Sequence, residues 1–295
     1  MRTRASGRVL LALLAVGAAG CGAAAIEPAP IADGPDGIDA DPGATAIEGT
    51  AHGFPALRDL EGQALAEGEF TQWVDGDRLH VRIRYDFGPS RWIEERSVIR
   101  QEPALVHERW SWEEVRDGTV QRRFDVDFLS GTAAARSLED GELHQWSKHF
   151  DLEPGSAFAG AVWPLAIRAV RSRLLAGEEI EFQTVGFTPK PRAGTVAITH
   201  VGLDHLRMSG RTLTADHFRI HAQIPWFLEP FVEVPDSHIW LANTAPAGFL
   251  RWEGPLGEPG DALVRVDLLP GEPSERAVPV ARAGSGAGAP GAEPR

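Results

Sequence analysis

The feature that most constrains the fold of this chain is a strict alternation of apolar and polar residues over positions 79–87. The apolar members are Leu79, Val81, Ile83, Tyr85 and Phe87, and the polar members between them are His80, Arg82, Arg84 and Asp86. Side chains in a β-strand point alternately to its two faces, so this pattern predicts a strand with one buried and one hydrated face.

Tight turn signals punctuate the residues that follow. Gly88-Pro89-Ser90 ends the first strand, and the pairs Asp117-Gly118 and Asp140-Gly141 each favour a two-residue hairpin turn. The strands expected between these turns are 92–100, 105–115, 121–129 and 143–150. Parallel strands would need long crossovers, so the short connections predict an antiparallel meander.

One helix interrupts the strands. Residues 158–175 carry apolar side chains at helical spacing, and Gly177 stands where a helix stop is expected. Pro164 lies inside this segment, so the regular helix either begins there or kinks there. Further strands are expected at 180–188, 195–201, 205–209, 213–224, 237–243, 249–253 and 263–268.

These elements define a mainly β fold. About ten to twelve strands with one main helix predict a large curved antiparallel sheet, a half-barrel or open barrel with the helix packed on or in it, because twist accumulates across many strands. The segments 22–49 and 271–295 are rich in Ala, Gly and Pro and lack periodic apolar residues. We expect a disordered tether and a disordered tail there, and a single domain over 50–270.

The N-terminus has the layout of an export signal, which we assign to residues 1–21. Arg2, Arg4 and Arg8 precede an apolar run over 9–19, which is shorter than the roughly 20 residues that span a bilayer. Ala18-Ala19-Gly20-Cys21 resembles a lipobox, and Cys21 is the only cysteine. We therefore expect Cys21 to carry acyl chains such as palmitate; cleavage as a plain secreted protein is the alternative.

Acylation would anchor the mature chain to a membrane, because two or three acyl chains hold firmly where one does not. Gly22, rather than Asp, follows the cysteine. By resemblance to lipoproteins of double-membrane bacteria, this favours the outer membrane, facing the periplasm or the cell surface. The chain after residue 21 has 26 Lys and Arg against 42 Asp and Glu, so we expect no nucleic acid partner.

Several stretches of the second half resemble an uncharacterised family of exported bacterial β-sheet proteins. They are Ala176-Gly177-Glu178-Glu179 leading into a strand, a hairpin around Gly210, His238-Ile239-Trp240-Leu241, and Phe249-Leu250-Arg251-Trp252-Glu253. The resemblance spans about residues 68–269. The architecture of that family is similar to the lipoprotein-carrier superfamily, a curved half-barrel covered by helix. The resemblance implies amphiphile binding in the concave face and transfers no residue role.

Catalytic motifs are absent from the sequence. It contains no Gly-x-Ser-x-Gly elbow, no glycine-rich phosphate loop and no His-Glu-x-x-His pair, so we expect neither enzymatic activity nor a cofactor. Asp125 and Asp127 share a strand face, as an acid–base pair would. Nearby Arg82, Arg84 and Arg123 make cross-strand charge pairing the simpler interpretation.

Histidines gather in one region of the sequence. His217 and His221 are four apart in an expected strand and so share a face, with His200, Asp204, His205 and Asp216 on neighbouring segments. Such groups could hold a divalent metal. Arg207 and Arg219 add positive charge to the same segments, so we favour a hydrated sheet face and expect no metal site.

Aromatic residues give the stronger functional indication, since nine tryptophans accompany a single tyrosine. Tryptophan suits both acyl chains and sugar rings, although core packing explains it equally. The residues expected to line a hydrophobic site are Val81, Ile83, Tyr85, Trp110, Trp112, Phe124, Phe128 and Trp163. Two hypotheses follow: an anchored protein that binds a lipid or other hydrophobic molecule in a concave sheet face, or a non-enzymatic structural or interaction module of the envelope with a fully packed core.

Overall fold

The computed structural model describes residues 48–223 and 234–268, which form one large antiparallel sheet with a helical segment. The first strands are β1 (Ala51–Gly53), β2 (Ala56–Asp59), β3 (Ala64–Asp75), β4 (Arg78–Asp86), β5 (Arg91–Arg100), β6 (Val106–Arg116), β7 (Thr119–Asp127), β8 (Thr132–Glu139) and β9 (Glu142–His149). After the helical segment follow β10 (Ile180–Phe187), β11 (Pro191–Met208), β12 (Arg211–Gln223), β13 (Ser237–Ala242), β14 (Phe249–Pro255) and β15 (Leu263–Asp267).

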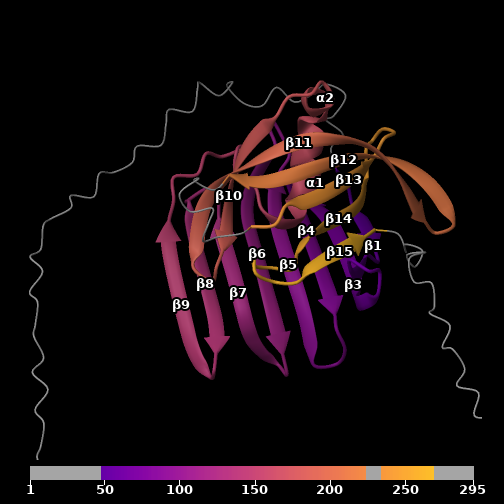
Figure 1. Cartoon of the computed structure of the whole chain (residues 1–295). Coiled ribbons are helices and arrows are strands. Elements are labelled where there is room, and N and C mark those ends of the chain that lie inside the picture. The colour runs from indigo at the N-terminus through magenta and orange to yellow at the C-terminus, as the bar shows by residue number, and fades with distance from the viewer. Residues whose placement is uncertain (1–47, 224–233, 269–295) are drawn as a thin grey trace, which may run out of the picture. The chain divides into compact units, whose positions relative to one another are not determined.

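The strands lie in the order β10-β11-β12-β13-β14-β15-β2-β3-β4-β5-β6-β7-β8-β9, and β1 pairs with β3 (Figure 1). Each pairing is antiparallel, and β2 joins the two halves of the chain by pairing with both β15 and β3. The sheet curves but is not closed, since β9 and β10 are its two edges. The expected fold class, a large open antiparallel sheet with one helical region, is confirmed.

The two Asp-Gly turns form as expected. Asp117 and Gly118 have φ angles of 50° and 72°, and Asp140 and Gly141 have 50° and 82°. Two successive positive φ angles define the turn whose twist matches that of the flanking strands. The same arrangement recurs at Ser209 and Gly210 between β11 and β12.

The expected number of strands was too low, because the described residues form fifteen. The sequence interpretation assigned no strand to β1, β2, β3 or β8, whose residues do not alternate strongly; β8 reads Thr-Ala-Ala-Ala-Arg-Ser-Leu-Glu. It also divided β11 into two strands, 195–201 and 205–209. These form a single strand with a bulge between His200 and Gly202, which breaks the alternation without ending the pairing.

The helical segment is shorter than the expected 158–175 and consists of three pieces. A 3-10 turn, η1 (Gly160–Val162), leads into α1 (Trp163–Ala169), and α2 (Arg171–Leu175) follows. Pro164 stands in the first turn of α1, where its missing N–H costs nothing, so the helix begins there instead of kinking. Val170, at φ −118° and ψ 13°, separates α1 from α2.

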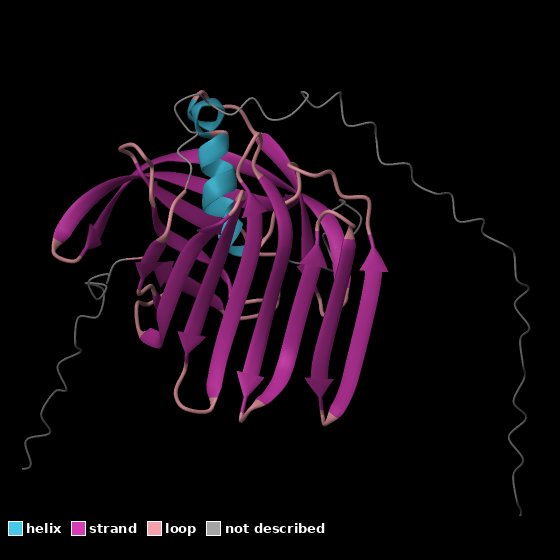
Figure 2. Cartoon of the chain, turned by 180° about the vertical axis from the view of Figure 1, so that it is seen from behind, coloured by secondary structure: helices cyan, strands magenta, loops and turns pink. Residues whose placement is uncertain are grey.

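The inner face of the sheet is the concave face against which α1 packs (Figure 2). Phe158, Val162, Ile167 and Leu174 are fully buried in a cluster with residues of β4, β5 and β10–β13. A second buried cluster joins β6, β7 and β8 to β10. The helix and its flanking segments therefore fill the space between the two halves of the sheet.

The expected signal, with Cys21, and the expected tail lie outside the described residues, as does the expected tether except for residues 48 and 49. Glu48 contacts the domain, since its carboxylate pairs with Arg168 of α1 and its backbone N–H donates to Gln101 Oε1 at 2.7 Å. No helix in the two described stretches is long and apolar enough to cross a membrane.

Candidate functional site on the inner face of the sheet

The structure places the expected ligand-lining residues on the inner face. Seven of the eight are buried, each no more than 8 % exposed, and Ile83 is partly buried. They do not form one group, however. Val81 and Trp163 pack in the cluster around α1, and Tyr85 packs near β2 and β15. Ile83 packs against both of these clusters, whereas Trp110, Trp112, Phe124 and Phe128 gather over β6 and β7.

An aromatic stack forms the centre of the β6–β7 group. The ring centroids of Trp112 and Phe124 are 5.2 Å apart, those of Phe124 and Phe187 are 4.5 Å apart, and those of Phe187 and Trp110 are 5.9 Å apart. Phe187 belongs to β10, on the far side of the sheet order. The stack thus joins the edge strand β10 to β6 and β7 on the other side of the sheet, and sequence reasoning did not include Phe187 in it.

Glu95 is a carboxylate on this same inner face, beside the aromatic stack. Its Oε1 accepts a hydrogen bond from Trp110 Nε1 at 2.8 Å and another from the backbone N–H of Ala161 at 2.5 Å. Burial raises the pKa of Glu95, while these two hydrogen bonds oppose the rise. Gly160 makes this approach possible, because a Cβ there would lie 1.9 Å from Glu95 Oε1.

His107 is fully buried nearby and stacks on Phe128 with ring centroids 4.4 Å apart. Its Nδ1 accepts from the backbone N–H of Ala159 at 3.4 Å. Burial lowers the pKa of His107 to about 3, so the imidazole is neutral at physiological pH. Glu95 and His107 therefore hold the segment before α1 against the sheet, and sequence reasoning missed both.

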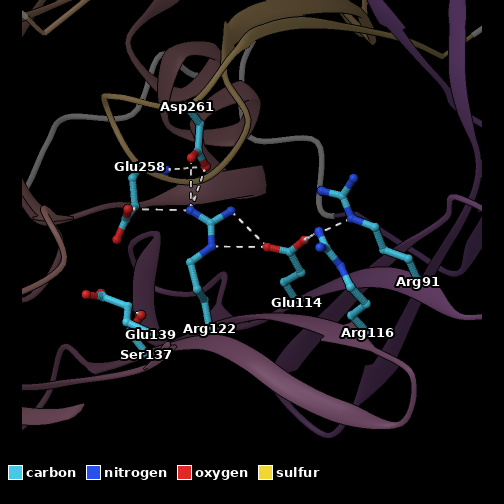
Figure 3. Close-up of polar contacts among 8 residues, drawn as sticks. All are labelled: Arg91, Glu114, Arg116, Arg122, Ser137, Glu139, Glu258 and Asp261. Carbon is cyan, nitrogen blue, oxygen red and sulfur yellow. Dashed lines mark hydrogen bonds and ion pairs between the residues drawn. The ribbon is translucent and has the colours of Figure 1, made fainter. Parts of the chain in front are cut away.

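A network of charged side chains lies beside the aromatic stack (Figure 3). We call this network the rim; it consists of Arg91, Glu114, Arg116, Arg122, Glu258 and Asp261. Arg122 of β7 donates to Glu114 through Nε at 3.1 Å and Nη2 at 3.0 Å. Its Nη1 donates to both carboxylate oxygens of Asp261, at 2.9 and 3.0 Å. Arg91 donates to Glu114 at 2.9 Å, and Arg116 approaches it at 3.7 Å.

Asp261 belongs to the rim loop, residues 256–262, which connects β14 to β15. The loop rests on Trp112, since a Cβ on Gly257 would lie 2.8 Å from the indole Cζ2 atom. The guanidinium of Arg122 lies 5.1 Å from the centroid of the same ring. Burial raises the pKa of Glu258, and the nearby Arg122 opposes that rise. The rim loop thus covers one end of the aromatic stack.

Two shallow hollows lie elsewhere in the described part of the chain. One, of about 370 Å³, is lined mainly by outer-face residues of β5–β8 such as Arg96, Arg109 and Asp127. The other, of about 510 Å³, lies around Phe54 and Glu67. Neither is an apolar pocket beneath α1.

The two aspartates on the outer face of β7 pair with arginines. Arg123 donates to both oxygens of Asp125, at 2.8 and 2.9 Å, and Arg109 lies 3.4 Å from Asp127. The aspartates are paired as expected, but the partners differ: Arg123 lies in the same strand as Asp125, the cross-strand partner of Asp127 is Arg109, and Arg82 and Arg84 pair with Glu94 and Asp86 instead.

The histidine-rich region separates into several contacts. His217 Nε2 lies 2.9 Å from His238 Nδ1, while His217 Nδ1 lies 3.2 Å from Asp204, so its two nitrogens face different partners. His221 pairs with Asp236 at 2.7 Å. Asp216 contacts Arg171 of α2 and lies 3.8 Å from His200 Nε2, and His205 contacts Thr214. Among the described residues, no group of three or more His, Cys, Asp or Glu side chains could hold a metal ion.

Comparison with known proteins gives little guidance. No family model matches the chain, and no curated protein matches it. Among solved structures, it is similar to the crystal structure of the hypothetical lipoprotein YmcC from Escherichia coli (K12), with 13% sequence identity over 76% of this chain and 90% of that chain. The TM-score of 0.32 does not establish a shared fold. The resemblance to the lipoprotein-carrier superfamily therefore stays a prediction.

Proposed function

We propose that this chain is a lipid-anchored protein of the bacterial envelope, with Cys21 as the acylated residue. The charged start, the short apolar run and the lone cysteine after small residues support this proposal. The absence of an Asp after Cys21 favours the outer membrane. The folded domain would then act at a membrane surface.

At that surface, the domain binds a hydrophobic molecule on the inner face of its sheet. One observation carries this proposal: Trp112, at one end of the aromatic stack, is contacted by Gly257 of the rim loop. Moving this loop would therefore expose part of the Trp112 indole. Aromatic side chains offer extended apolar area for an acyl chain or a similar ligand.

The domain is proposed to act without catalysis. The carboxylate of Glu95 has structural partners in Trp110 and Ala161. His107 accepts from a backbone N–H and stays neutral. A general base must lie within hydrogen-bond reach of the substrate proton that it accepts. Glu95 and His107 instead accept hydrogen bonds from the protein itself, which favours a role in packing.

A packed interaction module is the competing function, and the low exposure of the inner face favours it. Trp112, Phe124 and Phe128 are 4 % exposed or less, as expected of an ordinary core. In that case the acidic outer surface would meet a partner protein or a cell-wall polymer. A ligand-binding domain should co-purify with lipid, whereas a packed interaction module should not.

Anchoring is tested in the producing bacterium by labelling with a palmitate analogue. The wild-type chain should incorporate the label and sediment with membranes, whereas Cys21→Ser should lose the label and become soluble. Incorporation of label by Cys21→Ser would contradict the assignment.

Ligand binding is tested with the soluble Cys21→Ser chain, purified from envelope extracts without detergent. Mass spectrometry should find the same lipid class in independent preparations, near one molecule per chain. Consistently lipid-free protein, together with a specific partner captured by cross-linking, would favour the packed module.

A further inference from the structure

We propose that the ligand of the inner face is an anionic amphiphile, and that the carboxylates of the rim loop occupy the position of its head group. This inference rests on the hydrophobic-ligand function proposed above. It adds the charge of the ligand, the residue that recognises that charge and the segment that competes for it.

The charge balance of the rim is the first step. Glu114 is 4 % exposed and has three arginines around it: Arg91 at 2.9 Å, Arg122 at 3.0 Å and Arg116 at 3.7 Å. One carboxylate cannot neutralise three guanidinium groups. Arg122 is the least exposed of the three, with 18 % of its side chain accessible against 33 % for Arg91 and 55 % for Arg116, so it is the guanidinium that most needs a further anionic partner.

The rim loop supplies the missing negative charge. Asp261 binds Arg122 Nη1 with both oxygens, and Glu258 Oε2 lies 3.4 Å from the same nitrogen. A third carboxylate, Glu139, accepts from Ser137 Oγ at 3.0 Å and points away from Arg122 in Figure 3. Only two loop carboxylates thus contact Arg122, and a carboxylate or phosphate head group would make the same charge-assisted hydrogen bonds.

The position of Arg122 connects the charged site to the apolar surface. Its guanidinium lies 5.1 Å from the centroid of the Trp112 ring, and Trp112 stacks on Phe124. An anionic head bound to Arg122 would place the first part of its chain on this indole. The geometry therefore suits a molecule with one charged end and one apolar end.

The construction of the rim loop allows it to leave this site as a unit. Asp261 N–H donates to Glu258 O at 2.9 Å, and Leu256 N–H donates to Ala262 O at 3.2 Å, so the loop keeps its own hydrogen bonds. Its contact with the indole is made at Gly257, which has no side chain to interlock there. Leu256 packs against both neighbouring buried clusters at the start of the loop. The ion pairs to Arg122 hold the part of the loop that carries Glu258 and Asp261, and an anionic ligand competes with those ion pairs directly.

The test uses the soluble Cys21→Ser chain and two fluorescent probes, dansyl-undecanoic acid and its uncharged methyl ester. Energy transfer from tryptophan to the dansyl group reports binding. The acid should bind about tenfold more tightly than the ester, because a hydrogen bond to a charged group contributes more than one to a neutral group. Arg122→Gln should remove this preference, with circular dichroism confirming that the variant is folded.

A loop variant gives an independent measurement. Glu258→Gln combined with Asp261→Asn keeps the shape of the loop but removes its charge, so the affinity for the acid should rise severalfold and that for the ester much less. Arg123→Gln is the matched control, because Arg123 lies next in sequence but pairs with Asp125 on the outer face. It should leave both affinities unchanged.

The possible failures are distinguishable. If acid and ester bind equally, and neither Arg122→Gln nor the loop variant changes their ratio, the head-group inference is wrong while hydrophobic binding stands. If neither probe binds the wild-type chain or the loop variant, the proposed ligand-binding function fails, and this inference fails with it.

Discussion

Arg171 of α2 donates through Nε to Oδ2 of Asp216 in β12, at 3.0 Å. Asp216 is 1 % exposed and also accepts from Asn243 Nδ2 at 2.9 Å. This carboxylate therefore ties the helical segment to the second half of the sheet. Its removal leaves a partly buried guanidinium without its main partner.

Asp216→Ala should lower the free energy of unfolding by about 3 kcal/mol, the usual cost of breaking a buried ion pair on one side. Urea denaturation measures the change. Glu178→Ala is the control, because Glu178 pairs with Arg173 where both side chains are well exposed, and such pairs contribute about 1 kcal/mol or less. Equal losses in the two variants would contradict the structural role of Asp216.

Gly160→Ala should destabilise the domain by about 2–4 kcal/mol. The residue has φ +59°, and an added Cβ would collide with Glu95 Oε1 and with Trp110 Nε1. Gly177→Ala separates the cost of the positive φ angle from the cost of the collision. Gly177 also has positive φ, at +89°, but an added Cβ would meet no atom within 4 Å. It should cost about 1–2 kcal/mol by thermal denaturation, so a loss as large as that of Gly160→Ala would show that collision is unimportant.

Glu95→Gln should make stability less dependent on pH. Because the folded-state pKa of Glu95 is raised, the folded protein holds this proton more tightly than the unfolded chain, and its contribution to stability is lost as pH rises through that pKa. The glutamine oxygen still accepts from Trp110 and Ala161. Relative to wild type, the variant should gain stability at pH 8 and little at pH 4, as measured by urea denaturation at the two pH values. If the difference in unfolding free energy between the variant and the wild type were the same at both pH values, the pKa of Glu95 would not be raised in the folded state.

His107 should stay neutral well below pH 6. Its folded-state pKa of about 3 lies below the ordinary value near 6.5, so acid protonates the unfolded chain first and stability falls as pH drops from 6.5 toward 3. NMR titration of the imidazole should show no protonation above about pH 4 while the domain is folded. A midpoint near 6 would mean that the ring is not buried as described. His107→Gln identifies the resonance.

The sequence was informative wherever alternation and turns act locally. The segments 79–87 and 121–129 differ from β4 and β7 by only one or two residues at each end, because one buried and one hydrated face impose the pattern. Strand β8 was not predicted, because its three consecutive alanines show no apolar–polar alternation and have low strand propensity. Its place is set by pairing on both sides, to β7 and β9.

The candidate site was only partly foreseeable for a related reason. Alternation identified the inward direction of Trp110, Trp112 and Phe124, which the buried cluster confirms. It did not indicate that Phe187 completes the stack, or that Asp261 reaches Arg122 from 139 residues away. Such contacts depend on how the sheet bends back on itself, and no local pattern encodes that bend.

The pairing of β2 with β15 has a consequence for how the domain is made. Ala56 of β2 pairs with Asp267 of β15. The backbone hydrogen bonds of β2, near the start of the domain, are therefore complete only when β15, the last strand, has formed. Strands β3 to β9 can pair with their sequence neighbours as they emerge, whereas this pairing closes a loop of about 200 residues, a slow step. Until it forms, β2 presents an open edge that can pair with another chain. The inner edge of β2 therefore stays unprotected until the C-terminal strand β15 is available to pair with it.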